Sequence, residues 1–355
     1  MSGARGQSQD ILSAASQDGP DEMGRELAAG PDAVEGTLSA VERLRPRLAA
    51  LIDGARRLVL VGTGASLAMG RASAPVWRAR LGGGRDLLVR QSTEAVLGDS
   101  DGWHVEPSDL VVAISQSGAS PETVAAARQA AAIGAPVLAI TAQSDSPLAT
   151  GATLVSIVAS GDERGASTKS ALATLGALLA IAGALPTDAD AVSAIGLRLR
   201  SIVASWETVT PAGRSLADAR QTWFLGFGSG LGIAEAGALL WHEKVARQAA
   251  AGTPSEFRHG PIEAAGAEDG VVLLDIDPPD PRREAYLERL RAELSELDVT
   301  VVELRPDPGE PAQGALAALL RVQQLCRATA LAAGTYRDGF SVLRRLVTPA
   351  NDLLG

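Results

Sequence analysis

The sequence predicts an α/β protein built from two doubly wound parallel sheets. An almost wholly apolar run at 109–114 is followed by a polar turn and an alanine-rich stretch at 122–133, as expected of a buried parallel strand and the helix after it. Strand candidates alternate with helical sequence along most of the chain. The order strand, Gly-x-Gly turn and helix also occurs twice, at Gly62 and Gly226 (226 − 62 = 164 residues apart), which indicates two similar units.

The first unit is expected to contain a sheet of about five strands. The strand candidates are 58–61, 87–90, 109–114, 136–141 and 153–158, with helix-like sequence between the central ones. Two helices, at 21–29 and 31–52, are expected before the sheet, and the second has an amphipathic face. A long apolar helix from Ser170 to about Leu185 follows the last strand.

The second unit is expected to repeat this arrangement after a connecting helix at 192–206. Its strand candidates are 222–225, 271–276 and 299–304, and its helices run through Lys244, over 281–297 and over 314–333. We therefore predict a flexible tail at 1–20, a first domain with the N-terminal helices at 21–190, and a second domain with the C-terminal tail at 191–355.

Composition excludes several classes of protein. The formal charge is 32 − 42 = −10 and the isoelectric point is about 5.0, which argues against nucleic acid or an anionic membrane surface as partner. We find no apolar run long enough for a membrane span and no signal peptide, and Cys326 is the only cysteine. We expect a cytoplasmic protein without a disulfide, a zinc cluster or another metal.

The turn after the strand at 109–114 is a candidate phosphate site. Its polar residues are Ser115, Gln116, Ser117 and Ser120, and Pro121 suits the first turn of a helix. Hydroxyl groups, free backbone N–H groups and the helix dipole would converge there on an anion. An ordinary polar loop is the alternative. Each Gly-x-Gly turn is weak evidence for a dinucleotide site, since neither completes G-x-G-x-x-G.

Two residues are candidates for acid–base chemistry. His259 lies in an irregular Ser-Glu-Phe-Arg-His-Gly-Pro segment, typical of functional groups carried by loops. Glu243 ends the helix after the second glycine turn, 259 − 243 = 16 residues earlier, and the dipole there tends to raise the pKa of a carboxyl. The alternative for Glu243 is a solvated glutamate paired with Lys244 or Arg247.

These motifs together resemble a known family. SQSGASPET at 115–123, STKS at 167–170, the two Gly-x-Gly turns and SEFRHGP at 255–261 are similar, in order and spacing, to the tandem sugar isomerase (SIS) domain family. That family includes the isomerase half of glucosamine-6-phosphate synthase and stand-alone aminosugar-phosphate deaminases and isomerases. The resemblance covers roughly residues 21–348.

The resemblance implies a fold, a substrate and a set of roles. The fold would be two flavodoxin-like, three-layer αβα domains in tandem, and the partner a phosphorylated sugar or aminosugar, with no cofactor. Glu243 would move a proton between C1 and C2, and His259 would open the sugar ring from a neighbouring subunit of a homodimer. The substrate-binding residues would be Ser66, Ser115, Gln116, Ser117, Ser120, Ser167 and Arg345.

The sequence also departs from the family pattern. Leu240 stands where a lysine precedes the proton-transferring glutamate, and Arg345 aligns with a lysine that forms a Schiff base, which arginine cannot do. The segment from Glu163 to Lys169 is one residue shorter than usual, which affects the placement of Ser167. Without a glutaminase domain, glutamine-dependent amination is not expected.

We therefore predict an enzyme that isomerises a ketose or aminosugar phosphate, with release of ammonia or an amine where the substrate carries one. A sugar-phosphate-binding regulatory protein without turnover is the second hypothesis. A scaffold without a ligand is the third.

Overall fold

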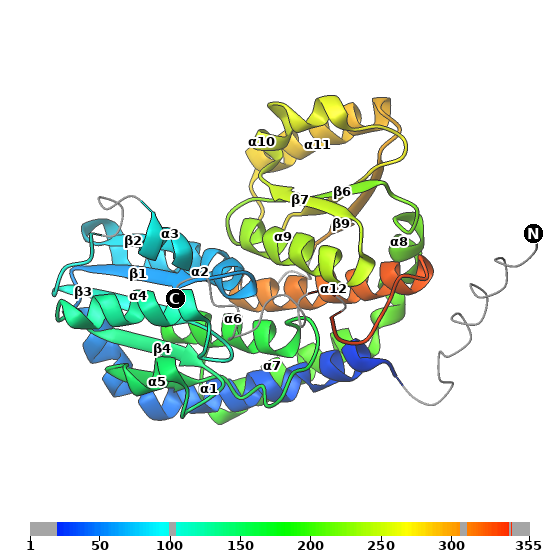
Figure 1. The fold of residues 1–355 in the computed structure, drawn as a ribbon. Helices are drawn as coiled ribbons and strands as arrows, with labels where there is room; N and C mark the ends of the chain where they lie inside the picture. The colour runs from blue at the N-terminus through cyan, green and yellow to red at the C-terminus, as the bar shows by residue number, and fades with distance from the viewer. Residues whose placement is uncertain (1–19, 99–103, 306–310, 341, 343–355) are drawn as a thin grey trace, which may run out of the picture.

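A computed structural model describes residues 20–98, 104–305, 311–340 and 342. Two parallel sheets lie one above the other in Figure 1, with helices on both faces of each. The chain is thus an α/β protein of the predicted flavodoxin-like class. The predicted tail, apart from Pro20, and Arg345 lie outside the described residues.

The first sheet has five parallel strands in the order β2-β1-β3-β4-β5. The strands are β1 (Arg57–Gly62), β2 (Asp86–Gln91), β3 (Asp109–Ile114), β4 (Val137–Thr141) and β5 (Leu154–Ile157). This is the flavodoxin-like strand order, whose direction of winding reverses between β1 and β3. Every residue of β3 is buried, because helices cover both faces of the sheet.

The helices of this unit are α1 (Glu22–Gly54), α2 (Ala65–Leu81), α3 (Ser92–Leu97), α4 (Pro121–Ala132), α5 (Pro147–Thr150) and α6 (Lys169–Ile181). The prediction of two separate helices at 21–29 and 31–52 was wrong, since α1 runs unbroken through Pro31. Pro31 is buried, and a Cβ at Gly30 would lie 3.1 Å from the Leu172 side chain of α6. Burial of this face against α6 outweighs the hydrogen bond that proline cannot make.

The second sheet has four parallel strands in the order β7-β6-β8-β9. They are β6 (Gln221–Gly226), β7 (Gln248–Gly252), β8 (Gly270–Leu274) and β9 (Thr300–Leu304). The order matches the first four strands of the first sheet. Strand β7 was not predicted, because Gln-Ala-Ala-Ala-Gly contains no β-branched or aromatic residue. As an edge strand it pairs with β6 alone.

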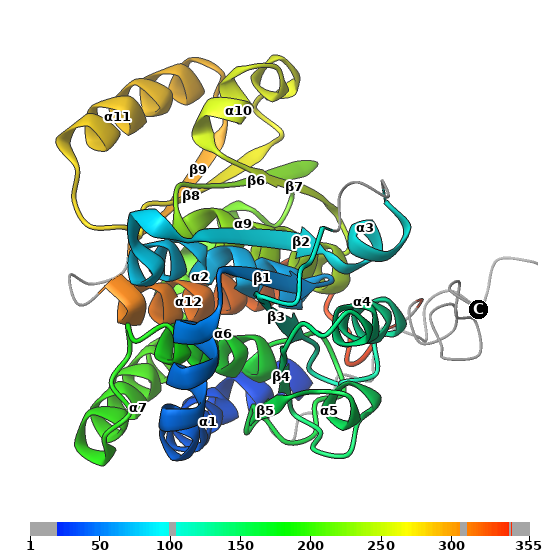
Figure 2. The ribbon, with the colours of Figure 1, turned by 90° about the vertical axis from the view of Figure 1, so that its left-hand side faces the viewer.

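The remaining helices are α7 (Ala189–Ala204), α8 (Thr210–Ser215), α9 (Ser229–Leu240), α10 (Pro254–Arg258), α11 (Pro281–Glu296) and α12 (Pro311–Ala332). A π-helical turn, η3 (Trp241–Val245), extends α9. Short 3₁₀ turns are η1 (Gly82–Gly84), η2 (Trp206–Val209) and η4 (Pro261–Ala264). Helices α9 and α12 cover one face of the second sheet, and α10 and α11 cover the other (Figures 1 and 2).

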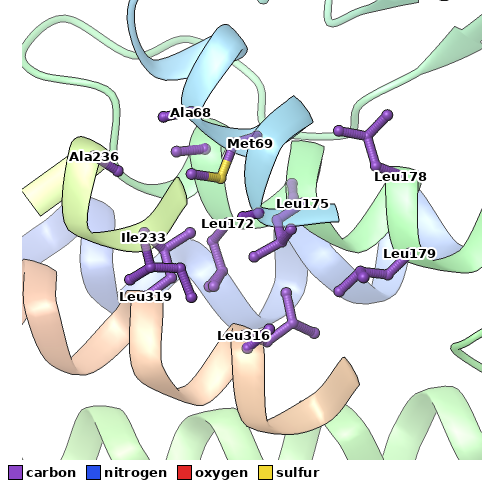
Figure 3. Close-up of a cluster of buried hydrophobic side chains, with 14 of the residues drawn as sticks. Ala68, Met69, Leu172, Leu175, Leu178, Leu179, Ile233, Ala236, Leu316 and Leu319 are labelled. Atoms are coloured by element: carbon purple, nitrogen blue, oxygen red, sulfur yellow. The ribbon is translucent and has the colours of Figure 1, made fainter. Parts of the chain in front are cut away.

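The two units share one hydrophobic core at the contact of α2 with α9. A Cβ on Gly232 would lie 2.2 Å from the backbone nitrogen of Ala72, so only glycine allows the helices to approach this closely. Figure 3 shows side chains from four helices meeting below this contact: Met69 from α2, Leu172 from α6, Ile233 from α9 and Leu319 from α12. No helix among the described residues is long and apolar enough to cross a bilayer.

Candidate active site

The turns after β1 and β3 lie side by side at the carboxyl edge of the first sheet. The last residues of the two strands, Gly62 and Ile114, are paired in register. This is the point where the strand order reverses, and parallel α/β sheets bind ligands there. Ser66 is the second residue of α2, and Ser115 is the first residue of the loop that leads to α4. The structure therefore brings the two predicted phosphate-binding turns together.

The N-terminus of α4 is open to an anion. Ser120 is the N-cap residue, but its hydroxyl pairs with that of Ser115 at 3.0 Å rather than capping the helix. Within the part of the chain that the structure describes, the backbone N–H groups of Glu122 and Thr123 have no acceptor. The exposed Ser117 accepts a bond from the Ala119 N–H at 3.2 Å. Free N–H groups at a helix start favour an anion such as phosphate.

The first turn of α2 is partly open, since the Ser66 N–H donates to the Thr63 carbonyl at 3.2 Å and no side chain caps the helix. Gly64 is its N-cap residue and provides no side chain to accept a hydrogen bond. Its φ of 56° is in the left-handed region, and Gly228 repeats this conformation (φ 49°) in the second unit. The two Gly-x-Gly turns therefore have the same backbone, as the sequence repeat suggests.

The second glycine turn differs in one respect, because a carboxylate of the protein occupies it. Asp277 accepts a hydrogen bond from the backbone of Ser229, the first residue of α9. A Cβ on Gly228 would lie 2.1 Å from the Asp277 carboxylate, so the acid fills the space at this helix start. The start of α6 is occupied in the same way, since Glu163 accepts from the backbone N–H of Ser170 at 3.2 Å. Of these four helix starts, α2 and α4 alone are free for an external anion.

Glu243 lies in the π-helical turn and lines a narrow pocket between the two units. The other lining residues are Ala65, Ser167, Ala171, Ala236, Leu239, Leu240, Leu319, Val322 and Gln323. The pocket leaves about 10 Å³, which is the room needed for about one water molecule. Ala65 places the pocket next to the turn that carries Ser66. Glu243 therefore lies close to the first of the two turns.

Burial raises the pKa of Glu243 to about 7, and the negative charge of Glu163 contributes to the rise while the positive charge of Lys244 opposes it. Among the described residues, no donor forms a hydrogen bond or ion pair with the Glu243 carboxylate. A carboxyl with a pKa near neutrality exchanges protons readily at physiological pH. Its chemistry is that of a general base or acid.

The alternative of a solvated Glu243 paired with Lys244 or Arg247 does not hold. Lys244 is itself buried and points away, with its Nζ donating to the carbonyls of Arg337 and Gly339 at 3.2 and 3.1 Å. The same ammonium lies 3.9 Å from Glu22 Oε1. Arg247 donates to the carbonyl of Ala219 at 3.0 Å. Lys244 thus joins η3 to the start of α1 and to the segment after α12.

Two other glutamates compete with Glu243 for the role of base, and both have partners. Glu235 forms an ion pair with Arg71 of α2. Glu256 is exposed and forms a capping box with Thr253, whose backbone and hydroxyl donate to it and lower its pKa. Among the described residues, Glu243 is the one of the three whose carboxylate has no hydrogen-bond or ion-pair partner.

His259 lies on the opposite face of the second sheet from Glu243. It follows α10, whose Phe257 packs against Trp223 with ring centroids 5.4 Å apart. Trp241, two residues before Glu243, packs against Phe224 at 5.5 Å. Consecutive strand residues point to opposite faces, so the sheet separates the two candidates. His259 is exposed and does not meet the Glu243 of its own chain.

The family model of the SIS domain matches residues 51–184. This part of the chain is therefore similar to a SIS domain. The matched residues include the first sheet, both open helix starts and the loop that carries Ser167.

Among the curated relatives, glutamine–fructose-6-phosphate aminotransferase (isomerizing) from Corynebacterium efficiens is 31% identical over 206 residues, covering 54% of this chain and 33% of the relative. The chain spans between a third and about half of the length of the curated relatives it matches. Tagatose-6-phosphate ketose/aldose isomerase from Escherichia coli has a TM-score of 0.74 at 22% identity, covering 90% of this chain and 94% of that one. Glucosamine-6-phosphate deaminase from Thermotoga maritima has a TM-score of 0.65 at 18% identity, covering 88% and 96%. These solved structures share the fold of this chain.

The structure thus places the predicted residues in three groups. Ser66, Ser115, Gln116, Ser117 and Ser120 lie at the carboxyl edge of the first sheet, and Ser167 lies with Glu243 in the adjoining pocket. His259 lies apart from both, and Arg345 falls outside the described residues. No group of three or more potential metal ligands occurs among the described residues.

Sequence reasoning missed the carboxylates of Glu26 and Asp277. Each of these carboxylates accepts a hydrogen bond from a backbone N–H more than 40 residues away in sequence: Glu26 from Arg164, and Asp277 from Ser229. These contacts form only when the chain folds. Neither has a spacing motif that would have revealed it.

Proposed function

We propose that the protein is an enzyme that moves a proton between C1 and C2 of a phosphorylated ketose or aminosugar, as an isomerase or a deaminase. The observation that carries the proposal is the unpaired, half-buried Glu243 carboxyl, with a pKa of about 7, beside two open helix starts. The SIS domain match and the activities in the names of the relatives support the same class of reaction.

Phosphate binding at the turns would position the sugar. The hydroxyls and N–H groups at the starts of α2 and α4 would hold the phosphate, with Ser66, Ser115, Gln116, Ser117 and Ser120 as the contributing residues. Because this anchor is fixed, the C1–C2 end of an open-chain sugar would extend towards the pocket lined by Ser167 and Glu243.

Proton transfer would follow from the properties of Glu243. As a carboxylate it would remove the hydrogen from the carbon next to the carbonyl, and as a carboxylic acid it would return the proton to the neighbouring carbon. The substrate carbonyl itself acidifies that hydrogen, so the step needs neither a metal nor an organic cofactor. The sequence departures at Leu240 and Arg345 favour isomerisation or deamination over glutamine-dependent amination.

His259 would take part from a second copy of the chain. It is exposed, and the sheet separates it from the Glu243 of its own chain. A homodimer in which each chain presents His259 to the other's site would bring the two residues together for ring opening. We also propose that the chain divides at about 190 into two domains, each with one sheet.

The test is hydrogen exchange in deuterium oxide with hexose and aminohexose phosphates, followed by NMR. The wild type should exchange the C2 or C1 hydrogen of a substrate. Glu243→Gln should bind the same sugar phosphate but exchange at least about 10²-fold more slowly. Glu235→Gln is the control, because that carboxyl is on the same helix and already paired. Binding without exchange by the wild type would instead indicate a regulatory sugar-phosphate-binding protein.

A further inference from the structure

A threonine hydroxyl joins two carboxyl groups close to the candidate active site. Thr168 Oγ1 lies 3.0 Å from Glu26 Oε2 and 3.1 Å from Glu163 Oε1. Glu26 belongs to α1, only 8% of its surface is exposed, and its other oxygen, Oε1, accepts from the Arg164 backbone N–H at 3.2 Å. Glu163 belongs to the loop between β5 and α6.

The two contacts compete for the single hydrogen of Thr168. A hydroxyl can form one full hydrogen bond to one carboxylate, or share its hydrogen between two acceptors in a weaker three-centre bond. For both contacts to be full hydrogen bonds, one carboxyl group must itself be protonated and donate to Thr168 Oγ1. Two carboxylates in contact with one buried hydroxyl would otherwise repel each other without a bridging hydrogen.

The distribution of the other donors decides which group carries the hydrogen. Glu163 accepts from the backbone N–H groups of Thr168 at 3.0 Å and Ser170 at 3.2 Å, and it contacts the Ser170 hydroxyl. Several donors of this kind favour the ionised form of a carboxyl. Glu26 has one backbone donor and is almost fully buried. We propose that Glu26 and Glu163 form an acid pair that holds one proton at neutral pH, carried by Glu26 and shared through Thr168.

The charges around Glu26 agree with this assignment. Burial is the main cause that raises the pKa of the Glu26 carboxyl, and the negative charges of Glu163 and of Glu22 on its own helix add to it. The hydrogen bond from the Arg164 backbone acts in the opposite direction, and so would donation by the Thr168 hydroxyl to Glu26 instead of to Glu163. From α12, the neutral Gln323 faces the same loop and donates to the Thr168 carbonyl at 2.9 Å.

The acid pair makes Glu26 a positioning residue for the candidate active site. This role, unlike the acid pair itself, rests on the proposed function. Thr168 and Glu163 fix the loop in which Ser167 lines the Glu243 pocket, and Ser167 Oγ lies 2.7 Å from Ser170 Oγ. The charge of Glu163 also acts on Glu243. The shared proton can move without a co-reactant. Glu26 gives its hydrogen to Thr168 Oγ1 while Thr168 gives its own to Glu163, so that one carboxyl loses a proton and the other gains it.

The first experiment detects the proton directly, without substrate. Infrared spectra at neutral pH are recorded for proteins with ¹³C-labelled and unlabelled glutamate, and their difference isolates the bands of glutamate side chains. Every protein carries Glu243→Gln, so that Glu243 does not contribute a band. We expect a C=O band of a protonated carboxyl that is lost in Glu26→Gln and kept in Glu42→Gln, a variant of an exposed glutamate on the same helix. Absence of the band, or its loss in Glu163→Gln alone, would overturn the proposal.

The second experiment measures the same proton through stability. Folded Glu26 keeps its proton to a higher pH than unfolded Glu26, so raising the pH from about 5 to 8 should favour unfolding. The Tm of the Glu243→Gln protein should therefore fall across this range by a few degrees more than that of the protein with Glu26→Gln added. Equal pH dependence in the two proteins would contradict the acid pair.

A third comparison concerns catalysis. Glutamine can donate to Thr168 as protonated Glu26 does, whereas alanine cannot. Glu26→Gln should therefore keep hydrogen exchange into the sugar phosphate within about threefold of wild type, and Glu26→Ala should lose at least about tenfold. If both lose activity equally, Glu26 does not act by donating. If the wild type exchanges no sugar hydrogen, the proposed function fails while the infrared and stability results still decide the acid pair.

Discussion

At the scale of single residues, the site depends on how the fold surrounds each carboxyl group. Glu243 is without a partner among the described residues, Glu235 is paired and Glu256 caps a helix, although all three are glutamates of the second unit. Under the proposed function, it is therefore the environment, and not the residue type, that singles out Glu243 as the base.

The first prediction concerns the pH dependence of activity. Exchange catalysed by Glu243 as a base should increase with pH and level off above about pH 7, because the carboxyl must lose its proton first. In Glu163→Gln the midpoint should move to lower pH, since the negative charge that helps to raise the pKa of Glu243 is removed. The measurement is the pH profile of the exchange rate, and a midpoint that rises or stays unchanged would count against this coupling.

The second prediction concerns stability. The pKa of Glu243 is raised from 4.5 to about 7 in the folded state, so folding binds a proton in this range and the protein loses stability as the pH rises through 7. Glu243→Gln removes this penalty. At pH 8 the variant should be more stable by on the order of 1–3 kcal/mol, and at pH 4 the difference should vanish. Urea denaturation at both pH values measures this, and a variant less stable at pH 8 would contradict it.

The sequence predicted part of this residue-scale picture. Glu243 could be predicted as a candidate because of its interval from His259 in the sequence. The serines could be predicted because they cluster after an apolar run. Glu26 could not be predicted in its role, because it lies 142 residues before Thr168 and the two meet only when α1 packs over the loop before α6. The hydrogen bonds of Asp277 have the same long-range origin.

At the scale of helices and strands, the two glycine turns show how similar backbones diverge in function. The turn before α2 is open, and the turn before α9 is filled by Asp277. Hydrophobic pattern and turn residues predicted most strands and helices, because those signals are local. They did not predict β7 or the π-helical turn at Glu243, whose sequences carry no local preference for these forms.

The third prediction tests the turn before α4. Ser117→Ala combined with Ser120→Ala should weaken sugar-phosphate binding about tenfold or more, since each hydrogen bond to a charged group contributes about 1.5–3 kcal/mol. Ser229→Ala is the matched control at the start of α9, where Asp277 occupies the anion position, and it should leave affinity unchanged. Calorimetry measures both. Equal affinities for the double variant and the wild type would remove phosphate binding from this turn.

At the scale of the whole molecule, the site lies where the two sheets are joined. The first unit provides the open helix starts, and the second provides Glu243 at the end of the helix that packs on α2. The close approach of α9 to α2 at Gly232 fixes the position of Glu243 relative to the open helix starts, so the contact between the units is also part of the candidate site. Among the predicted site residues that the structure describes, His259 is the one that this arrangement leaves out, because it lies beyond the second sheet.

The last prediction follows from that separation. If His259 serves the site of a partner chain, Glu243→Gln and His259→Ala should each be inactive as homodimers but should complement each other when mixed. A dimer with one chain of each kind has one site that receives both an intact Glu243 and an intact His259. Random exchange of subunits makes half of the dimers mixed, so about a quarter of wild-type activity should return. Activity is measured before and after subunit exchange, with sedimentation to establish the assembly. If His259 acted within its own chain, mixed dimers would have no intact site, and the absence of any recovery after proven exchange would exclude the shared arrangement.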